Sequence, residues 1–153
     1  MLSAKGYNHI GDIDVVGKII WAPIERQDKT KGEQIMARYD LDSLKFIDFF
    51  VVPQHHNAFV TIDPDSTFYS ADQFDDDTLL RYKFVDKTFR MLRHIKLSRR
   101  IDHIQGGDIA EGALWLSTDD DHNGLYRVDL TSGAVEDLGS MGHSDGDVYK
   151  RQQ

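Results

Sequence analysis

A regular spacing of 47 residues constrains this chain more than any other feature. His9, His56 and His103 are separated by two equal intervals of this length. The same succession of short apolar runs and turn residues follows each histidine. Self-similarity at a period of about 40–50 residues indicates a repeat architecture, in which each unit packs only on its neighbours. The 153 residues therefore contain three copies of one unit.

Each unit holds four short runs in which Val, Ile, Tyr and Phe alternate with polar residues, as is typical of β-strands. An aromatic residue in the second run and an arginine in the third recur in all three units. These residues are Trp21, Tyr69 and Trp115, and Arg38, Arg81 and Arg127. Residues 89–100 are rich in Arg, Lys, Leu and Met and also fit a short helix, but their place in the repeat predicts an outer strand.

Four strands per unit are the signature of β-propeller blades. We predict an all-β fold with a partial propeller over residues 1–146, whose four-stranded blades span about 7–53, 54–100 and 101–142. Closed rings have about four to eight blades. The sequence thus predicts an open fragment of a six- or seven-bladed ring, with His143 at the start of a fourth blade. Bare terminal blades predict oligomerisation or aggregation.

Residues 147–153 break the repeat pattern. The stretch from Asp147 to Gln152 resembles the read-through of a sequencing adapter that recurs at the ends of metagenomic open reading frames. We therefore predict a non-native or disordered tail. A natural charged C-terminus is the alternative.

Composition narrows the classes of partner. The net charge is −8, which disfavours binding to phosphate backbones and to anionic membrane surfaces. The absence of cysteine excludes disulfides, thiolate metal sites and cysteine nucleophiles. No apolar run approaches the roughly 20 residues of a membrane span, and Met1–Tyr7 lacks the apolar core of a signal peptide. We expect a small molecule or a protein as partner, and neither nucleic acid nor membrane.

Candidate site residues follow from the propeller architecture. The first strand of a blade lines the central channel, and the loop entering it shares one face with the loop between the second and third strands. The residues expected at this channel mouth are His9, Asp12, Asp14, His55, His56, Asn57, His103 and Asp108. Imidazoles there could bind a transition metal or act as general acid or base. Alternatively, the recurring histidines are hydrogen bonders that join blades, whereas His55 and Asn57 are not required by the repeat.

Acidic loops are expected on the same rim. Asp119, Asp120 and Asp121 are candidate ligands for Ca²⁺ or another divalent metal, and the run Asp75–Asp77 is similar. Adjacent aspartates also occur as solvated turns. The recurring arginines are expected to form ion pairs on the strand faces, and both tryptophans are expected in the core. No catalytic residue is assigned.

The strings at 9–14 (His-Ile-Gly-Asp-Ile-Asp), 114–121 and 124–133 resemble bacterial propellers of the YVTN/NHL and gluconolactonase-like group. The resemblance covers about residues 7–143. It implies blade architecture and, for the whole protein, a secreted or periplasmic location. Members include ligand-binding proteins and calcium-dependent lactonases, whose metal is held by Glu, Asn and Asp. In this sequence Asn8, Asn57 and Asp108 would supply only part of such a ligand set.

Two functions remain open at this level. The first is a binding scaffold for a small molecule or a protein, including a purely structural interaction module. The alternative is a metal-dependent hydrolase or lactonase with its site at the channel mouth. Whether the protein is an enzyme is left undecided, because fold alone does not specify activity.

Overall fold

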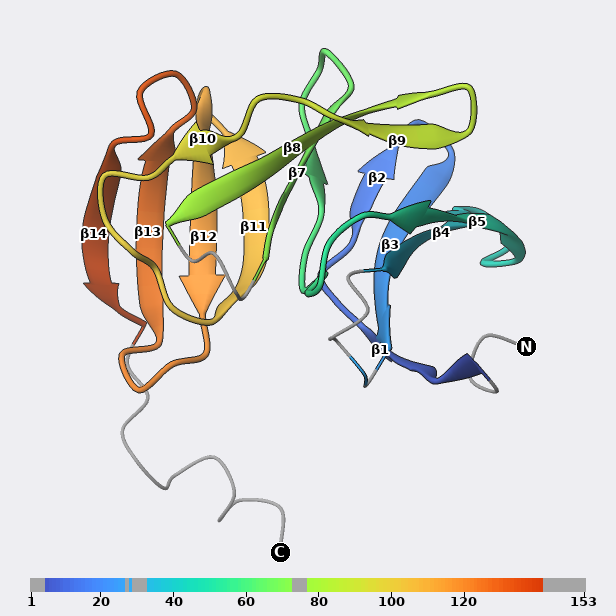
Figure 1. The fold of residues 1–153 in the computed structure, drawn as a ribbon, viewed down its shortest axis with the longest axis horizontal. Helices are drawn as coiled ribbons and strands as arrows, with labels where there is room; N and C mark the ends of the chain where they lie inside the picture. The colour runs from blue at the N-terminus through green and yellow to red at the C-terminus, as the bar shows by residue number, and fades with distance from the viewer. Residues whose placement is uncertain (1–4, 27, 29–32, 73–76, 142–153) are drawn as a thin grey trace, which may run out of the picture.

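The computed structural model describes residues 5–26, 28, 33–72 and 77–141. Within these ranges the chain forms strands β1 to β14 and no α-helix. They make three antiparallel sheets that fan out side by side (Figure 1). In the described part of the chain, no helix is long and apolar enough to cross a membrane.

Blade 1 contains the first five strands. They are β1 (Tyr7–Ile10), β2 (Asp14–Val16), β3 (Ile19–Arg26), β4 (Gln34–Asp40) and β5 (Phe46–Val52). Both β1 and β2 pair with β3, so the innermost strand is one strand in two pieces. Between the pieces the chain pairs with the next blade: the Asp12 amide donates to the Ala58 carbonyl at 2.7 Å, and the Val60 amide donates to the Asp12 carbonyl at 3.1 Å. This exchange of partner ties the inner strands of blades 1 and 2 together.

Blade 2 is interrupted on its outer side instead. Its strands are β6 (Thr61–Ile62), β7 (Thr67–Ala71), β8 (Thr78–Val85), β9 (Thr88–Met91) and β10 (Ile95–Lys96). Both β9 and β10 pair with β8. The segment from 89 to 100 therefore supplies the predicted outer strand and not the alternative helix. The break falls at residues 92–94, between the two pieces.

Blade 3 is uninterrupted. It consists of β11 (Ile104–Ala110), β12 (Ala113–Thr118), β13 (Gly124–Asp129) and β14 (Val135–Ser140), paired in sequence order. The three sheets confirm an all-β propeller built of four-stranded units. Residues Asp75, Asp76, His143 and 147–153 lie outside the described residues, so the predictions made for them remain predictions.

The strand register confirms the equivalent positions predicted from the repeat. Each aromatic residue of the second strand lies directly opposite an arginine of the third strand. The pairs are Trp21 with Arg38, Tyr69 with Arg81, and Trp115 with Arg127. Directly paired residues in a sheet point to the same face. Each blade therefore presents one aromatic side chain and one guanidinium on the same face.

The core lies between the blades. Trp21 of blade 1 contacts Phe68 and Phe84 of blade 2 edge to face, with ring centroids 4.9 and 5.2 Å apart. Between blades 2 and 3, Leu79 packs in one buried cluster with Leu114 and others. The Trp21-type face of a blade thus packs on the opposite face of the next blade. Edge-to-face aromatic pairs add about 0.5–1.5 kcal/mol each to the area they bury.

Blade 1 leaves its other face uncovered in the described part of the chain. Val15, Phe46, Phe49 and Val51 are 37–50% exposed. On blade 3, Trp115 is only half-buried, whereas Trp21 is buried. The arc of three blades therefore has a bare face at each end, which is the physical basis of the predicted self-association.

Candidate binding site where the three blades meet

A cavity of about 320 Å³ opens where the three blades meet. It is lined by Asn8, His9, Glu25, Arg26, His56, Gln105 and Asp119. They come from the beginning of the inner strands of blades 1 and 3, from the segment before β6 in blade 2, and from the ends of the second strands of blades 1 and 3. The cavity brings together residues that lie more than 90 positions apart in the sequence.

A buried acid–imidazole pair forms part of the cavity lining. The His56 Nε2 atom lies 3.2 Å from Glu25 Oε1, and the two side chains are only 6% and 3% exposed. The Asn57 backbone amide also donates a hydrogen bond to the same Glu25 oxygen. Glu25 belongs to blade 1, whereas His56 and Asn57 lead into blade 2. The pair therefore joins two blades at the wall of the cavity.

A network of buried amides holds this lead-in segment. Gln54 Nε2 donates to Ser70 Oγ at 2.9 Å and to Asn57 Oδ1 at 3.0 Å. Asn57 Nδ2 donates to the Ile35 carbonyl at 2.9 Å. Buried polar groups are stable only when they are hydrogen-bonded, so this network fixes the backbone position of His56. Asn57 is fully buried, and it does not line the cavity although the sequence placed it at the channel mouth.

Arg26 adds a positive charge beside this pair. Its Nη2 atom donates to the Tyr7 hydroxyl at 2.5 Å, and its guanidinium lies 4.4 Å from the centre of the Tyr7 ring. Its Nε atom is buried and meets no acceptor among the described residues. Since a guanidinium carries five N–H donors, Arg26 retains hydrogen-bonding capacity in a cavity wall.

The three histidines that mark the repeat are not equivalent in space. His56 is buried against Glu25, whereas His9 and His103 are exposed. His9 lines the cavity and His103 does not. The backbone of His103 has a φ of 50°, and its carbonyl accepts a hydrogen bond from the Asp119 amide at 3.2 Å. Of the two readings left open by the sequence, His56 fits the hydrogen bonder that joins blades.

Asp12 and Asp14 connect the inner strands. Asp12 Oδ2 accepts a hydrogen bond from the Gly107 amide of blade 3 at 3.2 Å. Asp14 Oδ2 accepts one from the Ile62 amide of blade 2 at 2.6 Å. Both carboxylates are therefore engaged by backbone donors of other blades. The structure gives them a place in the scaffold and does not bring them into the cavity.

His55 and Asp108 lie away from the cavity. The His55 Nδ1 atom is 3.1 Å from Asp72 Oδ2, and the His55 amide donates to the same oxygen at 2.8 Å. Asp108 is exposed and lies opposite Trp115 on the bare face of blade 3. Of the eight residues expected at the channel mouth, the cavity thus gathers two, His9 and His56.

The acidic loop of blade 3 contributes one aspartate to the cavity lining and another to a turn. Asp119 lines the cavity, and its Oδ1 atom accepts from Gln105 Nε2 at 3.3 Å. Asp120 Oδ1 accepts from Thr118 Oγ1 at 2.8 Å and from the Asn123 amide at 3.0 Å, which closes the turn. Among the described residues, no three His, Cys, Asp or Glu side chains are grouped as a metal site. The geometry therefore gives no support to the predicted divalent ion at Asp119–Asp121.

Glu25 and Arg26 are the cavity residues that the sequence reasoning missed. Both residues lie at the end of β3 and line the cavity from there. A usable signal exists: Glu25 lies four residues after Trp21, as Asp119 lies four after Trp115. Carrying the repeat register past the second strand would have placed both acids on the same rim.

Comparison with known proteins supports the fold. No family model and no curated protein matches the chain. Among solved structures, hydrazine synthase from Kuenenia stuttgartiensis superposes with a TM-score of 0.52 at 15% identity, over 86% of this chain and 35% of that one. The chain has the fold of a β-propeller. The β-propeller domain of Cps50 (Swd1) from Myceliophteria thermophila is also similar, with a TM-score of 0.46 and 11% identity over 94% and 42% of the two chains. The chain thus spans well under half of either structure.

Proposed function

We propose that this protein is a β-propeller scaffold that binds a small polar molecule in the cavity where its three blades meet. The observation that supports the proposal is the convergence of charged and polar side chains from all three blades on one cavity of about 320 Å³. Small molecules usually bind in concave sites where a few polar groups converge. We also propose that the chain belongs to the bacterial YVTN/NHL and gluconolactonase-like group, because its blade motifs resemble those of that group.

The lining defines the chemistry of the ligand. Glu25 and Asp119 offer carboxylates, Arg26 offers N–H donors, and Asn8 and Gln105 carry amides that both donate and accept. A ligand with donors and acceptors, such as a sugar or an amino acid, would satisfy this mixture. A purely apolar ligand would offer no hydrogen bonds to this lining, and displacing water from its polar groups would therefore be unfavourable. The alternative, a metal-dependent hydrolase, would need a group of metal ligands, and the described residues contain no group of three His, Cys, Asp or Glu side chains that could hold an ion.

Nuclear magnetic resonance titration tests the proposal. We would add glucose and glycine separately to the ¹⁵N-labelled protein and follow the backbone amides of Asn8, His9 and Gln105. The proposal expects a saturable shift of these amides with at least one of the two probes. Asp119→Asn removes one carboxylate from the lining and should weaken that binding about tenfold, as loss of a hydrogen bond to a charged group does.

Asp121→Asn is the matched control, because Asp121 is exposed in the same loop and does not line the cavity. It should leave the binding unchanged. Saturable binding that Asp119→Asn and Asp121→Asn weaken equally would count against this cavity as the site. Absence of any saturable shift with both probes would contradict the proposed ligand class.

A further inference from the structure

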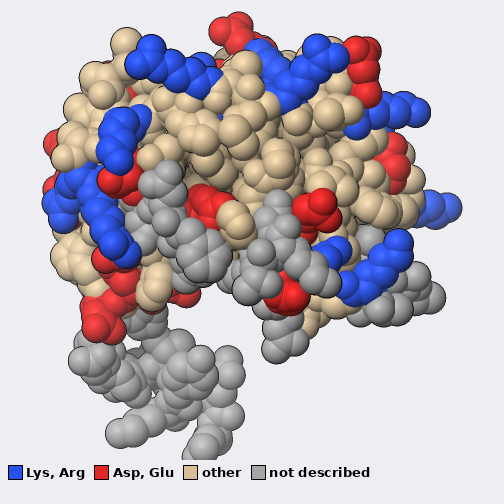
Figure 2. Space-filling model, in the orientation of Figure 1, with Lys and Arg blue, Asp and Glu red and all other residues tan. Residues whose placement is uncertain are grey.

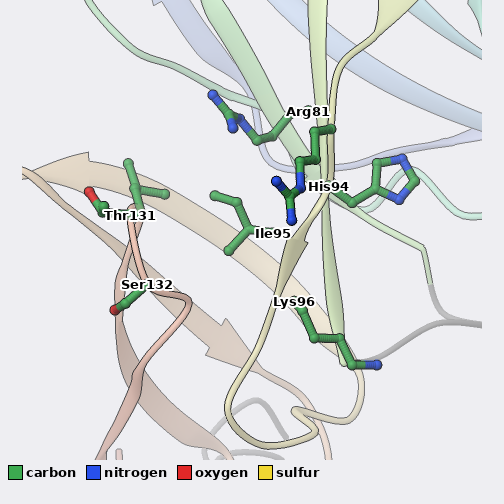
Figure 3. A pocket seen from close by; sticks show the side chains of 8 residues that line it. Arg81, His94, Ile95, Lys96, Thr131 and Ser132 are labelled. Carbon is green, nitrogen blue, oxygen red and sulfur yellow. The ribbon is translucent and has the colours of Figure 1, made fainter.

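A second cavity, of about 390 Å³, lies between blades 2 and 3 and has a different character. Arg81, Arg93, His94 and Lys96 line it, together with Leu130 and its neighbours in the turn between β13 and β14 (Figure 3). It shares no lining residue with the cavity where the three blades meet. None of the described residues lining it is Asp or Glu. Figure 2 shows basic side chains prominent along the upper edge of one face, although the chain carries a net charge of −8.

The repeat itself shows what is unusual about Arg81. Its equivalent in blade 1, Arg38, forms two hydrogen bonds of 2.7 Å with Asp48 of the outer strand. Its equivalent in blade 3, Arg127, lies 3.8 Å from Glu136 of the outer strand. In both blades the carboxylate is the residue directly opposite the arginine. Two of the three register arginines thus form the ion pairs predicted from the sequence.

Blade 2 has no acid at this register position. The outer strand is broken between β9 and β10. At this position its link to Arg81 is a backbone hydrogen bond, in which the Leu92 amide donates to the Arg81 carbonyl at 2.8 Å. Arg93 and His94 follow in the same break. The break therefore removes the carboxylate partner and at the same time adds a second guanidinium to the surroundings of Arg81.

The Arg81 guanidinium is left with unused donors. It is half-buried, lies 5.7 Å from the centre of the Tyr69 ring and interacts with the Tyr69 hydroxyl, which leaves its other N–H groups available. Its Nε atom is buried and meets no acceptor in the described part of the chain. The nearby Asp63 is engaged by the Tyr69 hydroxyl at 3.0 Å. A buried donor without an acceptor is unfavourable by about 1–3 kcal/mol, and more for a charged group.

The other basic residues differ in their contacts. Lys96 forms an ion pair with Asp77, so part of its charge is compensated. Arg93 is exposed and forms no ion pair with another described residue. Figure 3 shows the His94 imidazole on the opposite side of its segment from Ile95, Thr131 and Ser132. Two guanidinium groups, those of Arg81 and Arg93, therefore dominate the positive charge of the cavity.

We propose that this cavity binds a small organic oxyanion, a carboxylate or a phosphate, which takes the place of the acid found in the other two blades. Arg81 and Arg93 supply paired N–H donors that can bind two oxygens of a carboxylate or of a phosphate. The Thr131 hydroxyl offers a further donor, and Ile95 and Leu130 offer apolar surface for a short carbon body. The Ser132 hydroxyl is already engaged with Asp129 at 2.7 Å.

Titration of the full chain with inorganic phosphate and, separately, with acetate tests the proposal. We expect saturable shifts of the ¹⁵N backbone amides at 92–96 and 131–132 with at least one anion, and the preferred anion identifies the source of the oxyanion. Arg81→Gln should weaken the binding at least about tenfold. Arg93→Gln lies at an exposed position and should do the same without disturbing the fold.

Arg127→Gln is the matched control, since it changes the equivalent arginine on the bare face of blade 3. It should leave the affinity unchanged. No saturable shift with either anion would overturn the proposal. Binding that a folded Arg93→Gln variant and a folded Arg81→Gln variant retain at full strength would overturn it as well.

Discussion

The two junctions between blades use the same register positions with different chemistry. At the first junction, between blades 1 and 2, Trp21 packs among phenylalanines and Arg38 is held by Asp48. At the second junction, between blades 2 and 3, Tyr69 packs with aliphatic side chains and Arg81 faces a cavity without a carboxylate partner. At the first junction, the residues of the two blades fill the interface, and Arg38 has its acceptor within the chain. At the second junction the Arg81 Nε donor meets no acceptor in the described part of the chain. A repeat therefore fixes where a side chain lies without fixing what it does.

Removing the central aromatic of the first junction should have the largest effect. Trp21→Ala deletes a buried indole with three edge-to-face neighbours. We expect the free energy of unfolding, measured by urea denaturation, to fall by about 3–5 kcal/mol. Trp115→Ala is the matched control on the bare face of blade 3, where the indole is half-buried and donates to the Ala110 carbonyl at 3.1 Å. Its loss should be about 1 kcal/mol, and equal losses would contradict the packing of blade on blade.

The close backbone approach at the first junction can be tested through Gly11. A Cβ added to Gly11 would lie 2.1 Å from the Ala58 carbonyl oxygen. Gly11→Ala should force the inner strands apart, with a loss of about 1–3 kcal/mol. It should also speed the hydrogen exchange of the Asp12 and Val60 amides, which bond across this junction. The control is Gly112→Ala in an open turn with a φ of 73°. If that variant exposes the same two amides equally, the close approach is not what holds the junction.

Acid should weaken the first junction through Asp48. Hydrogen bonds from Arg38 lower the pKa of the Asp48 carboxyl. A lowered pKa means that the ion pair stabilises the fold above the ordinary aspartate pKa of about 4, and that this stabilisation is lost as the pH falls through the folded value. Because Asp48 is 37% exposed, we expect Asp48→Asn to lower stability by only about 1 kcal/mol at neutral pH.

The measurement is the urea midpoint of the parent chain and of Asp48→Asn between pH 7 and pH 2. The two curves should converge at the acidic end. A constant difference across the whole range would show that the substitution acts through packing instead of charge.

The smallest effect is expected at the register equivalent on the bare face. Arg127 lies 3.8 Å from Glu136, with side chains 41% and 61% exposed. Arg127→Gln should change the free energy of unfolding by about 0.5 kcal/mol or less, since exposed ion pairs are screened by water and salt. A loss as large as that of Asp48→Asn would indicate that another surface covers this face in solution, and light scattering would then show association.

Much of the fold was accessible from local patterns. Strand positions, the outer strand at 89–100 and the recurrence of an aromatic residue in the second strand and an arginine in the third follow from alternation and from the repeat. The candidate site was predicted less well. Of the residues expected at the channel mouth, His9 and His56 line the cavity, whereas Asp12 and Asp14 bond to backbone amides of other blades, and Glu25 was not among the candidates. Sequence patterns show which residues share a face, whereas hydrogen-bond partners depend on how neighbouring blades meet.

The sequence by itself determined the unit of 47 residues, its four strands and the recurrence of aromatic and basic residues, because these depend on local alternation and turn chemistry. Only the tertiary structure decided how far each recurring residue is buried and which partner it bonds to. It buried His56 against Glu25 and left His9 exposed. It paired Arg38 with Asp48 and left Arg81 without a carboxylate partner in the described chain. The physical reason is that the bonding partners of a side chain lie on other strands and other blades. In blade 2, a break of three residues in the outer strand leaves no carboxylate opposite Arg81.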